Sequence, residues 1–183
     1  GMNTSLLFEQ LKDLRKITDV PVVIMGYFNP ILQFGIKKFC KSCKEVGVDG
    51  LIIPDLPVDI YNDKYQKTFK SYGLLNMFLI TPQTSQRRIK YIDKISEGFI
   101  YMVSSYNVTG AIDSFDSFQK KYFKRINSMK LKSPLLVGFG ISNKDTFIDA
   151  GKYSHGAIIG SAYINWISEN GICKTSDFIK SLK

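Results

Sequence analysis

Two glycine-containing segments near the end of the chain have the composition of a phosphate-binding site. Gly138 and Gly140 follow one apolar run and precede a helical pattern, while Gly160 and Ser161 follow the next apolar run and begin another. Glycines at such turns let backbone N–H groups approach an anion closely, and the N-terminus of a helix adds a favourable dipole. One such turn alone is more often only a tight strand-to-helix connection. The pair on successive strands favours a phosphate site.

Other polar residues leave their roles open. Asp55 follows an apolar run and stands between two prolines, where it could act in catalysis or cap the helix that follows. The segment 104–110 is long, small and polar, so it could form a lid or simply a long connection. His155 precedes the last apolar run, on the side away from the predicted site, and is expected to be structural or exposed. The sequence contains no Ser-His-Asp set, metal-ligand cluster or P-loop.

The cysteines do not predict a metal or redox site. Cys40 and Cys43 form a CxxC, but a zinc site needs two further ligands and the sequence has a single histidine. A thioredoxin-type CxxC begins a helix just after a strand, whereas this pair falls inside a helical pattern. With Cys173 the sequence has three cysteines, and an odd number of free thiols is typical of a reducing compartment such as the cytoplasm.

These candidates are positioned by an alternation of two hydrophobic periods along the chain. Continuous apolar runs predict strands over 20–27, 50–54, 74–80, 98–103, 135–139 and 156–159. Helical spacing predicts helices over 6–14, 36–46, 59–72, 85–96, 114–127 and 144–150, a short helical piece after 161 and a closing helix over 176–182. Asn29-Pro30 is expected to break the chain after the first strand.

The alternation predicts an α/β fold in a single domain over residues 1–183. Strands this apolar are buried on both faces, as in a parallel sheet covered by helices. Strict alternation with short connections indicates either a doubly wound sheet or a (β/α) barrel, and both bind ligands at the carboxyl ends of their strands. The glycine turns, Asp55 and the 104–110 segment all lie at that edge.

Composition excludes several other classes of protein. A chain of 183 residues with 44% hydrophobic and 13% aromatic residues is too apolar to be disordered, and no apolar run reaches the ~18 residues of a membrane span. The formal net charge of +9 could attract nucleic acid. The positive residues are scattered, however, and form no nucleic-acid motif, so a lysine-rich solvated surface is favoured.

Several strings resemble the tryptophan synthase alpha chain family. They are Met25-Gly26-Tyr27-Phe28-Asn29-Pro30, Gly47 to Pro57 with its Pro-Asp-Leu-Pro, Gly98-Phe99-Ile100-Tyr101, Val108-Thr109-Gly110, Gly138-Phe139-Gly140-Ile141-Ser142 and Gly160-Ser161-Ala162. They occur in family order and span nearly the whole chain. The resemblance implies a (β/α)8 TIM barrel, here incomplete with about six parallel strands, and a lyase of tryptophan biosynthesis. This enzyme cleaves indole-3-glycerol phosphate to indole and glyceraldehyde 3-phosphate.

The resemblance also implies site residues and a partner. The phosphate would be held by Gly110, Gly138, Gly140, Gly160 and Ser161. The indole end would be lined by Tyr27, Ile52, Leu79 and Tyr101, with Thr109 in a closing lid. Asn29 and Pro30 would face a tryptophan synthase beta chain, and no cofactor or metal ion is implied.

Two departures from the family pattern qualify these expectations. Asn107 stands where the lid usually carries a glycine, although asparagine tolerates a left-handed backbone better than most residues. The sequence also begins at what resembles the helix after the family's second strand. The family's catalytic glutamate and an aspartate that engages the indole nitrogen belong to the part before it. We therefore expect the catalytic residues to be lacking and the 183-residue chain to be inactive alone.

Six strands cannot close an eight-stranded barrel, so the apolar strands at the two edges are expected to favour self-association. A non-catalytic protein that binds a phosphate ligand or the beta chain is the alternative to a lyase. A phosphoribosyl isomerase is a further alternative, but that fold places acids at the ends of its first and fifth strands, and no matching pair is found.

Overall fold

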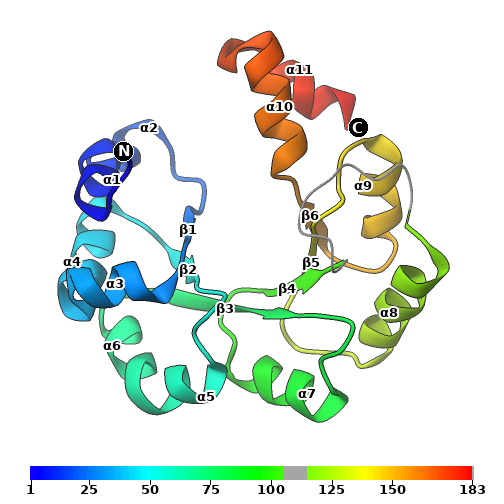
Figure 1. The fold of residues 1–183 in the computed structure, drawn as a ribbon, viewed down its shortest axis with the longest axis horizontal. Helices are drawn as coiled ribbons and strands as arrows, with labels where there is room; N and C mark the ends of the chain where they lie inside the picture. Colours follow the sequence, from blue (N-terminus) through cyan, green and yellow to red (C-terminus); the bar gives the residue numbers. More distant parts are fainter. Residues whose placement is uncertain (105–114, 183) are drawn as a thin grey trace. The chain divides into compact units, whose positions relative to one another are not determined.

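The structure is a computed structural model, and it describes residues 1–104 and 115–182. Helices and strands alternate along these residues, as the hydrophobic pattern predicts (Figure 1). They form two compact units, residues 1–78 with 95–98 and residues 79–94 with 99–183. The single domain expected over residues 1–183 stays a prediction.

The first unit is built on parallel strands that pair with their neighbours in sequence, in the order β1-β2-β3. Ile24 lies opposite Leu51, and Leu51 lies opposite Asn76. Its elements are α1 (Thr4–Leu11), α2 (Leu14–Ile17), β1 (Val23–Met25), α3 (Phe28–Phe34), α4 (Ile36–Val46), β2 (Gly50–Ile52), α5 (Val58–Ile60), η1 (Tyr61–Tyr65), α6 (Gln66–Ser71) and the first part of β3 (Leu75–Ile80).

Aromatic packing joins the helices that cover this unit. Helix α4 is amphipathic, and its buried side carries Phe39, Cys40 and Cys43. The Phe39 ring lies 5.3 Å from that of Phe8 in α1 and 6.3 Å from that of Phe34 in α3. Helices α1, α3 and α4 accordingly lie side by side (Figure 1).

The chain break expected at Asn29-Pro30 is wrong, because both residues lie in the first turn of α3. A proline in the first turn of a helix removes an N–H that has no partner within the helix, so its cost there is small. The preceding strand is also shorter than predicted, since β1 covers only Val23–Met25 of the apolar run 20–27.

The helix predicted over 59–72 is present as three successive pieces, α5, η1 and α6, of which η1 is a π-helix. Tyr61 begins the π-helix with its side chain fully buried. Its ring lies 5.4 Å from Phe69 and 5.3 Å from Phe78, both edge-on. The wide turn places a large aromatic side chain into the core between α6 and β3.

The second unit contains another parallel series in the order β4-β5-β6. Its elements are the end of β3, α7 (Gln86–Ile95), β4 (Ile100–Val103), α8 (Ser117–Ser128), β5 (Leu135–Gly138), α9 (Lys144–Gly151), β6 (Gly156–Ile158), α10 (Ser161–Asn170), η2 (Ile172–Lys174) and α11 (Thr175–Ser181). Helix α10 has ten residues and is longer than the short piece expected after 161.

Local capping fixes where α8 begins. The Asp116 carboxylate accepts the Gln119 N–H at 2.7 Å, and the Gln119 side chain accepts the Asp116 N–H at 2.9 Å. This reciprocal pair is a capping box, so the helix begins at Ser117 rather than at the predicted position 114. Behind it, Phe123 and Ile126 are fully buried.

Among the described residues, no helix combines the length and apolar character needed to cross a bilayer.

Candidate functional site

In the first unit, the carboxyl ends of β1 and β2 carry two of the residues predicted to bind substrate. Ile52 is buried, with 5% of its surface exposed, and pairs with Met25 in β1 and Met77 in β3. Tyr27 follows β1 at the N-cap of α3, and 70% of its surface is exposed. Ile52 is therefore part of the strand core, whereas Tyr27 is free to contact a ligand.

The predicted partner residues lie on the surface beside Tyr27. Asn29 and Pro30 are exposed in the first turn of α3. The Phe28 N–H at the start of that turn donates to both carboxylate oxygens of Asp55, at 2.9 and 3.1 Å. Asp55 therefore caps α3, which precedes it, and the following helix α5 has no side-chain cap. Of the two roles left open for Asp55, capping of the following helix is therefore not observed.

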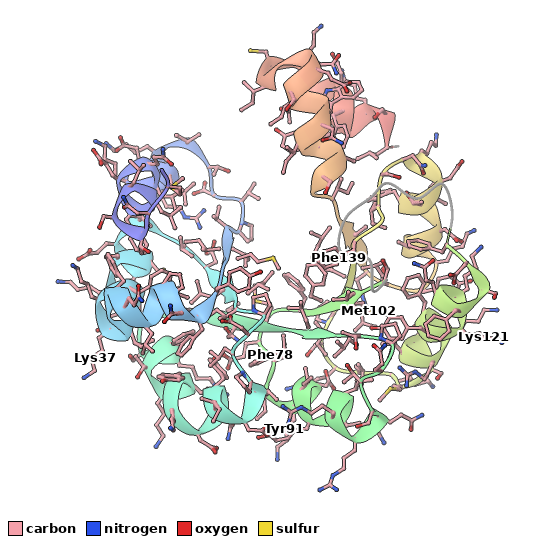
Figure 2. The ribbon with its side chains drawn as sticks, in the orientation of Figure 1. Lys37, Phe78, Tyr91, Met102, Lys121 and Phe139 are labelled. Carbon is pink, nitrogen blue, oxygen red and sulfur yellow. The ribbon has the colours of Figure 1, made fainter. Side chains whose placement is uncertain are left out.

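In the second unit, Tyr101 lies in β4 with 4% of its surface exposed, and its ring is 5.8 Å from that of Phe139. Burial raises the pKa of Tyr101 to about 12. Leu79, near the end of β3, is half-buried. The neighbouring strand carries Gly138, opposite Val103 in β4. Figure 2 labels Met102 in β4 and Phe139 just after β5.

Ser104 anchors the turn that follows β5. Its N–H donates to the Gly138 carbonyl at 3.1 Å, and its hydroxyl donates to the Phe139 carbonyl. Ser104 is fully buried, so both bonds are shielded from water. Phe139 and Gly140 have positive φ angles of 65° and 75°. Only glycine adopts this region at little cost, so the conformation of Phe139 is held by its surroundings.

The two glycine turns come together because β5 and β6 are paired. Gly138 lies opposite Ile158, two positions before Gly160, and Ser161 begins α10. Among the described residues, a Cβ added at Gly160 would meet nothing within 4 Å, so they leave the space around this backbone open. The first N–H groups of any helix have no partner within it. The ends of β5 and β6 can therefore bind an anion through backbone N–H groups and the dipole of α10.

Two predicted site residues, Thr109 and Gly110, lie outside the described residues, as do Asn107 and most of the 104–110 segment. Their roles stay predictions.

His155 is structural, as expected. The Leu135 N–H donates to His155 Nδ1 at 3.0 Å, and the His155 N–H donates to the Leu135 carbonyl at 2.8 Å. These bonds join the starting ends of β5 and β6, away from the edge that carries the glycine turns.

The CxxC lies on the buried side of α4, and both thiols are fully buried. Burial raises the pKa of Cys40 to about 11 and that of Cys43 to about 12, which keeps both thiols protonated at neutral pH. In the part of the chain that the structure describes, no group of three or more His, Cys, Asp or Glu side chains could hold a metal ion.

Sequence reasoning missed two contacts, one in each unit. The bond between Asp55 and Phe28 joins residues 27 positions apart, and no local pattern indicates it. The bonds of Ser104 to Gly138 and Phe139 likewise join distant residues, and the polar composition of 104–110 does not indicate them. A polar residue at the end of a buried strand was the only available signal for either residue.

A family model described as "Tryptophan synthase alpha chain" matches residues 1–182. A curated protein of that description from Flavobacterium psychrophilum is 58% identical over 182 residues, covering all of this chain and 72% of its own length. A protein of the same description from Christiangramia forsetii is 58% identical with the same coverage.

Solved structures extend the similarity to the fold. A chain of the tryptophan synthase α2β2 complex from Pyrococcus furiosus superposes with a TM-score of 0.84 at 29% identity, covering all of this chain and 73% of its own. The alpha subunit from the same organism gives a TM-score of 0.84 at the same identity and coverage. The strand–helix alternation and these neighbours assign the TIM-barrel class of α/β fold to the chain.

Proposed function

The chain belongs to the tryptophan synthase alpha chain family, and from this premise we propose that it binds indole-3-glycerol phosphate in the manner of that family. The family consists of lyases that cleave this substrate to indole and glyceraldehyde 3-phosphate. The single observation that carries the proposal is the family match over residues 1–182, which includes both glycine turns.

The phosphate group is assigned to the ends of β5 and β6. Gly138 and Gly140 follow β5, while Gly160 and Ser161 lead into α10, and the pairing of Gly138 with Ile158 supports a shared site. The open space at Gly160 leaves room for an oxygen atom of the phosphate. Gly110 is the remaining residue proposed to bind the phosphate.

The indole end of the substrate is assigned to apolar and aromatic residues. Tyr101 suits this role because its side chain is buried and its ring lies against that of Phe139. Leu79 of the same unit is proposed to share this role. The substrate contacts predicted for Tyr27 and Ile52 in the first unit, and for Thr109 in a closing segment, stay predictions.

A matched pair of substitutions tests the phosphate site. Gly160→Asp and Gly160→Asn add side chains of nearly equal size into the open space, but only Asp adds a negative charge. We expect Asp to weaken binding of indole-3-glycerol phosphate at least ~10-fold relative to Asn, which corresponds to ~1.4 kcal/mol. Equal affinities of the two variants in calorimetric titration would exclude this phosphate site.

A tryptophan synthase beta chain is the proposed protein partner. One of the solved relatives is described as an α2β2 complex, and Asn29 and Pro30 are exposed in α3, as a contact surface requires. A protein that activates the beta chain without cleaving the substrate is the second candidate. Activation of a beta chain by this chain, measured together with its own indole release, separates the two.

A cytoplasmic location is also proposed, since the described cysteines are all free.

Self-association through strand edges is a further part of the proposal. Among the described residues, β1 pairs only with β2 and β6 only with β5, and Met25 in β1 is 49% exposed. Unpaired apolar edges favour pairing with another chain. Light scattering at micromolar concentration is expected to show dimers that Met25→Lys reduces. Ile179→Lys, a similarly exposed position in α11, is the control, and a monomeric wild-type chain would contradict the idea.

A further inference from the structure

The first turn of α3 has no cap from its own sequence. Tyr27 stands at the N-cap, and its side chain makes no capping hydrogen bond. An N-cap side chain usually accepts the N–H of the second or third helical residue, and the third residue here is Pro30, which has no N–H. The orientation of this turn must therefore be fixed by contacts from elsewhere.

Asp55 supplies the missing contact from the turn that follows β2. Its two carboxylate oxygens accept the Phe28 N–H at 2.9 and 3.1 Å. A negative charge at the N-terminus of a helix is favourable, and a charged acceptor strengthens the hydrogen bond.

The turn that carries Asp55 is itself well anchored. Asp55 stands between Pro54 and Leu56, and Pro57 follows. The Leu56 N–H donates to the Ile53 carbonyl at 3.1 Å, and the Leu56 side chain is buried with 3% exposed. Prolines restrict the backbone of this turn. The backbone that carries the Asp55 carboxylate is therefore restricted in position.

A ring contact fixes the same helix start from another side. The Phe28 ring lies 5.2 Å from the ring of Tyr65 in η1. The N–H of Phe28 and its side chain are thus held by different elements. Tyr27 precedes this doubly held residue, and Asn29 and Pro30 follow it, all three with exposed side chains.

We propose that Asp55 is a positioning residue that holds the Tyr27–Pro30 turn in the orientation required for docking of the beta chain. This inference rests on the proposed partnership with a beta chain. Asp55 acts through the Phe28 N–H, which its two carboxylate oxygens accept. Removal of the Asp55 carboxylate would leave Asn29 and Pro30 unchanged but would take away the hydrogen bond that orders the first turn of α3. Binding of the beta chain would then have to order this turn, which costs binding free energy.

Three variants of the whole chain test this role. Asp55→Ala removes the acceptor, Asp55→Asn keeps one acceptor oxygen without the charge, and Asp63→Ala removes an exposed carboxylate from η1 as a charge-matched control. Each is titrated with the beta chain from the organism of one of the 58%-identical relatives. Each is also titrated with inorganic phosphate, since the phosphate site is assigned to the other unit.

Asp55→Ala is expected to weaken beta-chain binding by about three- to tenfold, the range for losing a helix cap at an exposed position. Asp55→Asn is expected to recover most of that loss, and phosphate affinity is expected to be unchanged in all variants. Amide hydrogen exchange at Phe28 is expected to be faster in Asp55→Ala than in Asp63→Ala.

The outcomes separate this inference from the proposed function. Failure of the unaltered chain to bind the beta chain would overturn the proposed partnership. If the unaltered chain binds but Asp55→Ala and Asp63→Ala bind equally well, the positioning role is overturned. Equal losses of beta-chain and phosphate affinity in Asp55→Ala, with a lowered melting temperature, would also overturn it, because they indicate a general loss of folding.

Discussion

The hydroxyl of Tyr101 occupies the position that a side chain on Gly138 would need. A Cβ added to Gly138 would lie 2.0 Å from the Tyr101 hydroxyl oxygen and 2.2 Å from Cζ. The two residues lie on paired strands, with Tyr101 in β4 and Gly138 at the end of β5. The absence of a side chain at Gly138 is therefore required by the packing of the tyrosine ring, whether or not a phosphate binds there.

Gly138→Ala is expected to destabilise the chain by about 1–3 kcal/mol, the usual cost of overpacking a buried site. Tyr101→Phe should not rescue it, because the ring carbons remain within 2.4 Å of the added Cβ. Tyr101→Leu removes the ring and should recover part of the loss. Urea denaturation measures all three effects, and Gly151→Ala, where nothing lies within 4 Å, is the control. A neutral Gly138→Ala would contradict the packing argument.

Arg15 is expected to be the most sensitive surface cation of the first unit. Its guanidinium donates to the carbonyls of Gly47, Thr18 and Val20 and pairs with the Asp49 carboxylate. Arg15→Ala removes the donor to the three carbonyls and to Asp49, although Asp49 still accepts the Val22 N–H. A loss of about 1–2 kcal/mol in unfolding free energy is expected, since the group is part-exposed.

The control for Arg15 is its neighbour. Lys16 pairs with Asp13 at 2.9 Å, and its side chain is 80% exposed, so Lys16→Ala should change stability little. Thermal unfolding of the two variants checks the contrast. Equal effects would show that the carbonyl contacts of Arg15 contribute nothing measurable.

Asn76 is a site where substitution should stabilise the chain. Its side chain is fully buried in β3, and neither its oxygen nor its nitrogen has a hydrogen-bond partner among the described residues. A buried amide without partners costs about 1–3 kcal/mol. Asn76→Leu should therefore raise unfolding free energy by about 1 kcal/mol, after allowance for imperfect packing. Asn127→Leu on the exposed side of α8 is the control, and a destabilised Asn76→Leu would show that the amide is satisfied in solution.

The cysteines should react very unequally with a thiol reagent at pH 8. Cys173 is exposed, whereas Cys40 and Cys43 are buried with pKa values raised by burial to about 11 and 12. One thiol is expected to react rapidly in the folded chain and three after unfolding in urea. Cys173→Ser should abolish the rapid reaction, and rapid labelling that persists in this variant would contradict the burial of α4.

The same shifts predict a loss of stability at alkaline pH. The pKa values of the Cys40 and Cys43 thiols are higher in the folded chain than the ordinary value of 9.0, so the folded state binds more protons than the unfolded state above that pH. The contribution of the two thiols to the free energy of unfolding is complete below pH ~9 and is lost as the pH rises toward ~11–12. Unfolding free energies measured from pH 8 to 11 should fall, and the fall should be smaller in a Cys40→Ala, Cys43→Ala double variant.

The alternation of apolar runs and helical spacing predicted the strands β1 to β6 and most of the helices, because strands and helices have different hydrophobic periods. It did not predict α3. The helix boundaries that depend on side-chain hydrogen bonds were harder to predict from the sequence. The start of α8 depends on the reciprocal bonds of Asp116 and Gln119, and Asn29-Pro30 belongs to a helix because a proline is tolerated in a first turn.

The motifs of the candidate site were visible in the sequence, but the reasons for them were not. By itself the sequence determined the fold class and the family, since these depend on local patterns and short strings, and it predicted the edge of the sheet at which ligands are proposed to bind. Tertiary structure decided that Gly138 makes room for Tyr101 and that Asp55 caps α3 rather than the helix after it. Both relationships join residues far apart in the chain, and parallel strand pairing brings such residues together without leaving a local pattern.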